Sequence, residues 1–203
     1  MIEFKPVVKP ANLTGQTNGK LSPFVLAPVY FPGYGHRSAH SNAVRCWNAL
    51  AIHFHLATGK TLTVTPGGAY RTYDMQVSAF NVRMQSWYNP LTCTTTTRLW
   101  NGKKYWLKRG YAPVATPGTS NHGWGLAFDM ALWTGTSIVG ITSNTAAWKW
   151  IVDNYAKYGF SHEGAKPGTP GYEPWHIRLV CGDAIPPVVL ELEAFFKAAA
   201  GQA

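Results

Sequence analysis

The chain has 203 residues, enough for one well-buried domain or two small ones. Only 13% of its residues are charged, about half the usual share, and its three cysteines are too few and odd in number for a disulfide framework. The net charge of +9 favours a polyanionic partner, namely nucleic acid, anionic lipid or a bacterial wall, but no run of five like charges marks a basic tail.

The amino terminus, Met-Ile-Glu-Phe-Lys-Pro, lacks the charged-then-apolar pattern of a secretion signal, and no apolar run has the length of a membrane span. We therefore expect synthesis in the cytoplasm, so action outside the cell would need another route of release. Cys46, Cys93 and Cys181 form no Cys-x-x-Cys pair, so a cysteine zinc site is not indicated, and one disulfide between two of them stays open.

The first third of the chain predicts an irregular segment followed by regular elements. Residues 1–34 are rich in Pro, Gly, Asn and Thr and read as an extended, irregular lead-in with one short apolar run, Phe24 to Tyr30. Helical spacing begins at Ser38 or Ser41 and continues to about Thr58. Residues 61–65 then alternate like a short strand.

The middle of the chain contains a segment of a different kind. A second helix is predicted from Thr72 to about Met84. Residues 85–117 follow with a threonine run at 94–97, and Trp-Asn-Gly-Lys at 100–103 is typical of a hairpin turn. We interpret 85–117 as an insertion or flap.

The last part of the chain alternates between strands and helices without a fixed order. Residues 125–132 are apolar enough for a buried strand, and 144–158 have clear helical spacing. A further strand is predicted over 176–180, and a final helix begins at Pro186-Pro187 and runs to about Ala199. The mixture predicts an α+β fold, a small antiparallel sheet flanked by helices.

Two separated motifs supply groups that could bind a metal. Residues 120–129 read Ser-Asn-His-Gly-Trp-Gly-Leu-Ala-Phe-Asp, and Glu-Pro-Trp-His follows downstream. His122, Asp129 and His176 offer two imidazoles and a carboxylate, and Glu173 offers a spare carboxylate. Three protein ligands, an open position for water and a general base are what a zinc hydrolase needs. Only nine residues of the chain are acidic, and two of them fall in this proposed site.

The spacing of His122 and Asp129 needs a change of backbone direction between them. Seven residues apart, the two side chains would point to opposite faces of one straight strand. Gly123 and Gly125 allow the backbone to turn after His122, so that Asp129 can point inward from a following strand. For these two residues alone, a structural histidine with the aspartate at a strand edge is an equally good interpretation.

The motifs resemble a known family. Ser-x-His-x-x-Gly-x-Ala-x-Asp followed by Glu-x-Trp-His looks like the M15 zinc peptidases, which include D-Ala-D-Ala carboxypeptidases and dipeptidases and phage endolysin L-alanyl-D-glutamate peptidases. Residues 68–76 are similar to the family's Gly-Tyr-Arg-Ser-x-x-x-Gln stretch, with Ala69 inserted in the Gly-Tyr pair. The resemblance covers roughly residues 60–180.

The resemblance implies one peptidase domain over 1–203, of the D-Ala-D-Ala carboxypeptidase and hedgehog-like type. It implies one zinc ion per chain, Glu173 as catalytic base and acid, and Arg71 as the group that binds the scissile carbonyl oxygen as it becomes an oxyanion. The implied zinc ligands are His122, Asp129 and His176. The substrate-binding residues are expected to be Ser120, Gln76 and Trp175. His162 lies near these motifs in the sequence and could touch substrate, but we expect it at the surface.

The leading hypothesis is therefore a zinc-dependent peptidase that cuts the peptide stems of bacterial peptidoglycan, working as a monomer. The missing signal peptide and the positive charge favour a phage endolysin that cleaves the L-Ala-D-Glu bond. A D-Ala-D-Ala carboxypeptidase with the same zinc site is an alternative, and a non-catalytic protein that binds polyanions or cell wall is the rival from another class. The basic residues at 103–109 could contact anionic wall polymers or lie in an exposed hairpin, and no specific nucleic-acid partner is expected.

Overall fold

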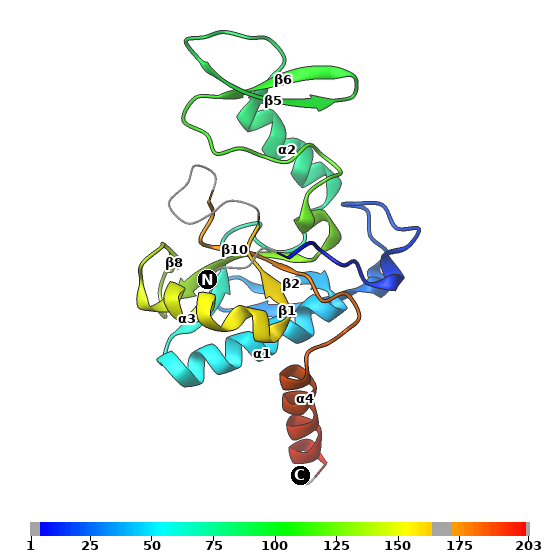
Figure 1. The fold of residues 1–203 in the computed structure, drawn as a ribbon, viewed down its shortest axis with the longest axis vertical. Coiled ribbons are helices and arrows are strands. Elements are labelled where there is room, and N and C mark those ends of the chain that lie inside the picture. The colour runs from blue at the N-terminus through cyan, green and yellow to red at the C-terminus, as the bar shows by residue number, and fades with distance from the viewer. Residues whose placement is uncertain (1–4, 164–171, 202–203) are drawn as a thin grey trace.

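An antiparallel sheet lies at the centre of the fold (Figure 1), in a computed structural model that describes residues 5–163 and 172–201. The strand order is β3-β7-β10-β9, and β8 pairs with the last three residues of β7. Residues 127–131 of β7 are all buried, which explains why this strand reads as a continuous apolar run. The strands are β3 (Thr61–Val64), β7 (Ala127–Trp133), β8 (Ile138–Gly140), β9 (Phe160–Ser161) and β10 (His176–Leu179).

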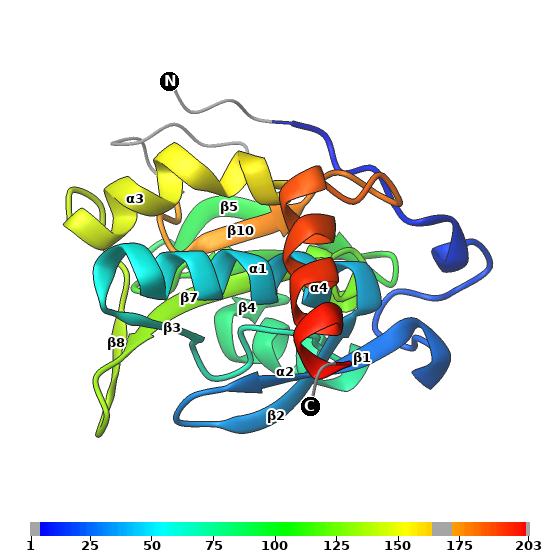
Figure 2. The ribbon, with the colours of Figure 1, turned by 90° about the horizontal axis from the view of Figure 1, so that it is seen from below.

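Helices cover one face of this sheet. Figure 2 shows α1 (Ser41–Thr58) and α3 (Ala146–Asn154) side by side across it, with α4 (Pro187–Ala200) beside them. In the core beneath these helices, Trp47 of α1 packs against Phe128 of β7, and their ring centroids lie 4.7 Å apart. The predicted α+β class with a small antiparallel sheet and flanking helices is thus confirmed.

The predicted irregular lead-in is wrong in its last third. There β1 (Leu26–Phe31) pairs with β2 (Gly35–His40) in a two-stranded antiparallel hairpin. The sequence of β2, Gly-His-Arg-Ser-Ala-His, has no apolar alternation, so only its pairing with β1 makes it a strand. The preceding residues form two short 3₁₀ turns and otherwise irregular chain, and residues 1–4 of the lead-in lie outside the described residues.

A second, three-stranded sheet occupies the segment interpreted as an insertion. It follows α2 (Tyr73–Arg83), with strand order β4-β6-β5, and lies at the top of Figure 1. Asn101 and Gly102, at φ 48° and 71°, make the predicted hairpin turn. Phe80, Met84 and Leu107 form a small apolar core of their own under this sheet. The strands are β4 (Met84–Gln85), β5 (Cys93–Trp100) and β6 (Lys103–Lys108).

Two further predictions need correction. The helix expected over 144–158 is α-helical only in α3 and continues as a 3₁₀ turn, Tyr155–Tyr158, before Gly159 ends it at φ 78°. Strand β8 was not predicted at all.

The three cysteines are free thiols. Within the described ranges, no helix combines the length and the apolar character needed to cross a membrane.

Candidate active site

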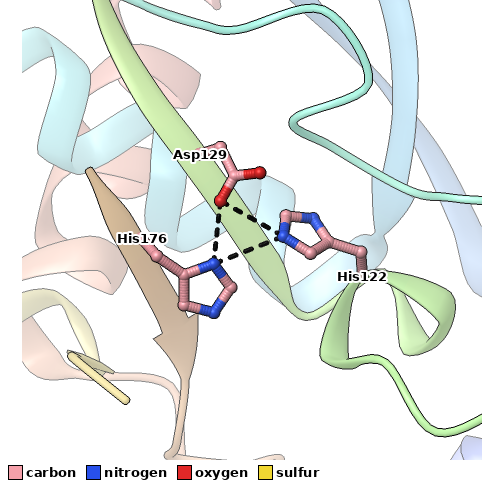
Figure 3. A group of neighbouring side chains, drawn as sticks. All are labelled: His122, Asp129 and His176. Carbon is pink, nitrogen blue, oxygen red and sulfur yellow. Dashed lines mark hydrogen bonds and ion pairs between the residues drawn. The ribbon is translucent and has the colours of Figure 1, made fainter. Parts of the chain in front are cut away.

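Three buried side chains from three different elements meet at one point (Figure 3). His122 Nε2 lies 3.3 Å from Asp129 Oδ1 and 3.3 Å from His176 Nδ1, and Asp129 Oδ1 lies 2.8 Å from His176 Nδ1. The three predicted ligand residues therefore place one nitrogen or oxygen atom each at the corners of a small triangle.

This triangle has the size that a zinc ion requires. Zinc binds histidine nitrogen and carboxylate oxygen at about 2.0–2.2 Å in a tetrahedral arrangement, so two ligand atoms lie about 3.3 Å apart. The observed separations of 3.3, 3.3 and 2.8 Å need only a small expansion to reach this geometry. Two imidazoles and one carboxylate are also a donor set that catalytic zinc sites use, with one position left for water. The residues present fit zinc.

Strand pairing brings two of these residues together. His176 on β10 and Asp129 on β7 are direct partners in the antiparallel register, so their side chains share one face of the sheet. His122 lies just before β7, on a 3₁₀ turn formed by Asn121–Trp124. The chain reaches β7 through Gly125 at φ 65°, where a Cβ atom would come 2.6 Å from the backbone nitrogen of His40. The required turn between His122 and Asp129 is thus made by glycine.

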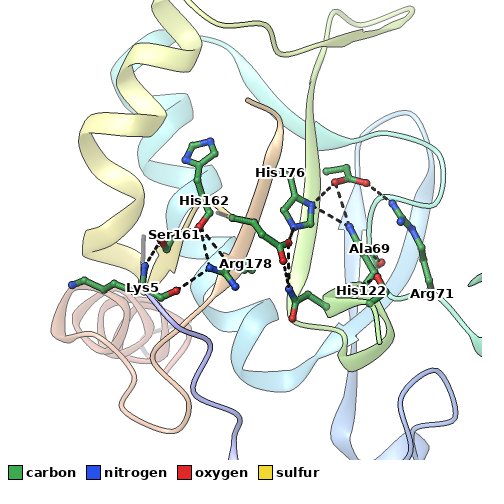
Figure 4. Close-up of polar contacts among 12 residues, drawn as sticks. Lys5, Ala69, Arg71, His122, Ser161, His162, His176 and Arg178 are labelled. Atoms are coloured by element: carbon green, nitrogen blue, oxygen red, sulfur yellow. Dashed lines mark hydrogen bonds and ion pairs between the residues drawn. The ribbon is translucent and has the colours of Figure 1, made fainter. Parts of the chain in front are cut away.

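Each of the three residues is held by an outer contact as well (Figure 4). The other ring nitrogen of His122, Nδ1, is 3.0 Å from the carbonyl oxygen of Ala69, which it can reach as an N–H donor, leaving Nε2 free as a ligand. The second oxygen of Asp129 is paired with the guanidinium of Arg71. His176 Nε2 lies 3.1 Å from Glu163 Oε2, an ion-pair contact that is not aligned as a hydrogen bond.

Burial and nearby charges shift the pKa values of His122 and His176 in opposite directions. Burial lowers the pKa of His122, because no water solvates its imidazolium form. Burial acts in the same direction on His176, but the carboxylates of Asp129 and Glu163 outweigh it and raise its pKa to about 9. Burial alone would raise the pKa of Asp129, yet the two imidazoles hold it well below its usual range. A buried carboxylate beside imidazole nitrogens is an environment that favours a cation.

Glu173 is placed as an available base. It lines the same cleft as the three residues, and its carboxylate has no hydrogen-bond partner within the described parts of the chain. Partial burial raises its pKa, and the nearby charges of His176 and Asp129 act on it in opposite directions. A carboxylate with a raised pKa is a better proton acceptor at neutral pH than an ordinary one. His176 is tied to Glu173 by a backbone hydrogen bond of 3.0 Å across the Pro174 turn.

The remaining predicted site residues surround this centre. Arg71 donates through Nε to the Gly67 carbonyl at 2.7 Å and through Nη2 to Asp129, so part of its donor array stays unused. Ser120 lines the cleft and caps the 3₁₀ turn, since its Oγ accepts from the backbone N–H of His122 at 3.3 Å. Trp175 also lines the cleft.

Gln76 also lines the cleft, but the structure gives it a supporting position. Its side-chain amide donates to Asn18 Oδ1 at 3.0 Å and to the Arg71 carbonyl at 3.3 Å, and its Oε1 accepts from Gly118 at 3.0 Å. The side chain is buried, and its contacts hold the Arg71 backbone to Asn18, which in turn bonds the Ser120 carbonyl before the 3₁₀ turn. Gly123 passes so close to Asn18 and Gln76 that a Cβ atom there would collide with both.

Sequence reasoning missed Asn18 and Glu163 and misplaced His162. Asn18 belongs to the lead-in, yet it is buried beneath the turn that carries His122, and its Nδ2 donates to the Ser120 carbonyl at 2.8 Å. His162 was expected at the surface, but it is fully buried between the rings of Tyr155 and Tyr172. Glu163 could have been suspected only because the chain has few acidic residues, nine in all, and Glu163 lies near the motifs.

His162 contacts the backbone of the segment that carries Glu173. Its Nε2 lies 3.3 Å from the carbonyl oxygen of Pro174, the residue after Glu173. Its own carbonyl accepts from the guanidinium of Arg178 at 3.4 Å, which links it to β10 (Figure 4). Burial lowers its pKa to about 4, so at neutral pH it is uncharged.

The triangle opens into a cleft of about 520 Å³, large enough for a small ligand. Arg71, Glu173 and Trp175 line it together with the triangle, and Arg83, the last residue of α2, and Arg98 of β5 line it from the side of the inserted sheet. A second cavity of about 620 Å³ lies between α1 and α4 and contains none of the metal-site residues. The cleft is therefore the candidate active site.

Comparison with known proteins gives a family, a relative and two solved structures. Residues 38–182 match the family model described as VanY, D-alanyl-D-alanine carboxypeptidase. The putative carboxypeptidase YodJ of Bacillus subtilis (strain 168) is 37% identical over 92 residues, a match that covers 41% of this chain and spans 34% of that protein's length.

The structure of the LdcB LD-carboxypeptidase is 24% identical with a TM-score of 0.55, covering 82% of this chain and 72% of that chain, and so shows a shared fold. A variant of the vancomycin-resistance D,D-pentapeptidase VanY in complex with Zn(II) is 21% identical, with a TM-score of 0.46 and coverage of 76% of this chain and 78% of that chain.

Proposed function

This chain belongs to the VanY family of D-alanyl-D-alanine carboxypeptidases, and on that premise we propose that it is a zinc-dependent peptidase acting on the peptide stems of bacterial peptidoglycan. The predicted membership in the M15 zinc peptidases is thereby confirmed. One observation carries the proposal: His122, Asp129 and His176 form a zinc-sized triangle in the cleft that also presents Glu173 and Arg71.

The chain's own residues account for proton transfer and charge stabilisation. A zinc ion at the triangle supplies Lewis acidity toward a peptide carbonyl and lowers the pKa of water. Glu173 accepts a proton from the attacking water and returns it to the leaving amine as the carbon–nitrogen bond breaks. Arg71 keeps unused N–H groups for the developing oxyanion. Its pairing with Asp129 Oδ2 also turns Oδ1 toward the histidines.

Removal of a terminal D-alanine is the first candidate reaction, because the family is described by that activity. Cleavage between L-Ala and D-Glu by a phage endolysin is the second. It is supported by the net charge of +9, which attracts the protein to an anionic wall, and by a cleft that continues past the metal triangle as far as Arg83. An exopeptidase needs room for one residue beyond the scissile bond, whereas an endopeptidase needs a groove.

The test is mass spectrometry of purified peptidoglycan after digestion with the zinc-loaded protein. Released D-alanine would identify the carboxypeptidase, and new N-terminal D-glutamate would identify the endopeptidase. Glu173→Gln should yield neither product, while Glu191→Gln, which changes an exposed acid on α4, should act like the wild type.

Metal analysis separates the enzyme from the non-catalytic rival. The enzyme predicts about one zinc per chain, and a structural role for the histidines predicts none, with salt-sensitive binding to the wall instead. A protein that holds zinc but produces no new ends from peptidoglycan would contradict the proposed function.

A further inference from the structure

We propose that the end of the cleft away from the metal triangle is an anion subsite, in which Arg83 and Arg98 bind a carboxylate of the substrate several residues from the scissile bond. The inference rests on the proposed function in its first candidate reaction, removal of a terminal D-alanine, because D-glutamate then lies at a distance from the scissile bond. It adds a substrate class, acidic stem peptides. All described acids that line the cleft, namely Asp129, Glu163 and Glu173, belong to its metal end. The cleft is also lined by Arg83 and Arg98, and neither forms an ion pair with an acidic residue of the described parts of the chain.

Helix α2 connects the two ends. Gln76, Ala79 and Arg83 all line the cleft, and their spacing of three and four residues places them on one face of the helix. The small side chain of Ala79 leaves the middle of that face open. From its first residue to Arg83 the helix rises about 15 Å, which is the length of four or five extended residues. The groove therefore suits a peptide stem that begins at the metal and ends at Arg83.

Arg83 is a partly buried residue of the cleft lining. No polar partner of its side chain is found among residues 5–163 and 172–201. An arginine in the last turn of a helix often bonds the final carbonyl groups, but here Lys108 does so, donating to Asn81 and Val82 at 3.2 and 2.9 Å. The guanidinium of Arg83 stays available to a ligand.

Arg98 approaches the same place from the inserted sheet. It lies on β5 opposite Tyr105 of β6, and both Tyr105 and Trp100 pack against Phe80 of α2. Arg98 shares a strand face with Trp100, because the two are two positions apart in the strand, so it lies on the side of the sheet turned to α2. Its Nε and Nη1 donate to the carbonyls of Val114 and Thr97, both at 3.0 Å. These bonds fix the guanidinium, while Nη2 has no hydrogen-bond partner among the residues that the structure describes.

The pair of arginines fits a carboxylate on a peptide. A guanidinium binds carboxylates through two parallel N–H groups, and a partly enclosed cleft strengthens the contact. Peptidoglycan stems carry such a group at D-glutamate, and the same position exists as the uncharged amide D-isoglutamine. The subsite therefore predicts a preference for the acidic stem over the amidated one.

The experiment compares two synthetic stem pentapeptides that differ only in this carboxylate or amide. For each peptide, kcat/KM is measured with the zinc-loaded protein, and Kd is measured by calorimetry on the Glu173→Gln protein, which binds without turnover. We expect the wild type to prefer the acidic peptide by about tenfold to hundredfold, the range for a hydrogen bond to a charged group. Arg83→Gln should remove most of this preference, Arg83→Lys should keep part of it, and Arg98→Lys should reduce it.

Arg109→Gln is the matched control. This arginine belongs to the same insertion but donates to the Pro90 carbonyl at 3.0 Å and does not line the cleft, so the preference should persist. Equal treatment of both peptides by the wild type, or a preference that survives Arg83→Gln, would overturn the subsite even in an active peptidase. Absence of cleavage together with an Arg83-dependent difference in Kd would instead refute the proposed function and retain the subsite.

Discussion

The two ends of the cleft are built in different ways. At the metal end, buried residues from paired strands are held by several contacts each, and Asp129 alone meets His122, His176 and Arg71. At the other end, Arg83 and Arg98 extend from a helix terminus and an inserted sheet that has its own small core. The chemistry therefore depends on strand register in the main sheet, whereas substrate preference depends on how the insertion packs on α2.

The largest effect should come from removing a ligand at the metal end. His176→Ala leaves a two-residue site, and we expect zinc content to fall from about one per chain toward zero. Loss of metal should reduce activity by about a thousandfold or more, since Lewis-acid stabilisation of several kcal/mol disappears. Elemental analysis and peptide hydrolysis check both, with His36→Ala, an exposed histidine on β2, as control. Retained zinc and activity in His176→Ala would show that His176 is not a zinc ligand and that the three residues are not the metal site.

The insertion core gives the next largest effect, and it should stay local. Leu107 is 4% exposed, and Leu107→Ala should destabilise the inserted sheet by about 2–5 kcal/mol. Hydrogen exchange should rise in β4, β5 and β6, while zinc content is unchanged because no ligand belongs to this core. Leu99→Ala is the control, since Leu99 is 69% exposed on the same sheet. Zinc loss in Leu107→Ala would show that the two ends are one cooperative unit.

The sequence predicted how His122 and Asp129 come together because the information for their arrangement is local. His122 and Asp129 lie within one short motif, and glycine permits the turn that separates them. Helix α1 was also predictable, since its buried residues follow a 3.6-residue period and Gly59 ends it at φ 67°. Periodicity and turn chemistry require no knowledge of distant parts of the chain.

The unpredicted features arise from contacts between segments and not from the pattern within any one segment. Strand β2 exists because β1 pairs with it, and nothing in its own sequence has a strand's alternation. Glu163 reaches His176 because β9 pairs with β10, Arg178 opposite Ser161, two residues before Glu163. His162 was wrongly expected at the surface because histidine is often exposed, and only the folded chain places two tyrosine rings around it.

Low pH should reduce the stability of the folded protein through protonation of His162, which supports the metal end. Its pKa is about 4 in the folded protein, below its ordinary value of 6.5. Between these two values the unfolded chain binds a proton that the folded protein excludes, so stability falls as pH decreases from about 6.5 to 4. The loss should total on the order of 3 kcal/mol. Denaturant unfolding of metal-free protein at several pH values measures it.

The variant His162→Phe isolates this contribution. It fills the space between the two tyrosine rings without a titrating group, so the slope of stability against pH between 4 and 6.5 should become shallower by about one proton. His55→Phe changes an exposed histidine of α1 and should leave that slope nearly as it is in the wild type. Identical slopes for the wild type and His162→Phe would show that His162 does not couple protonation to folding.

The smallest predicted effect concerns Glu163, which contacts a ligand rather than the metal. Its carboxylate lies 3.1 Å from His176 Nε2, and this imidazole lowers the pKa of Glu163 to about 2. A carboxylate on the far side of a metal-bound histidine fixes the ring and raises its basicity. Glu163→Gln should therefore weaken zinc affinity by about 10–100-fold, measured by competition with a chelator, and activity at saturating zinc should fall less than in His176→Ala.

Glu163→Asp separates this positioning effect from simple loss of charge. Aspartate keeps the negative charge but is one methylene shorter, so it should recover zinc affinity only in part if contact with His176 matters. Full recovery would show that the charge of the cleft alone is responsible. Glu163→Gln could instead change the acidic-peptide preference and leave zinc affinity unchanged. That result would show that Glu163 acts in substrate recognition, because its main action would then be repulsion of the substrate carboxylate.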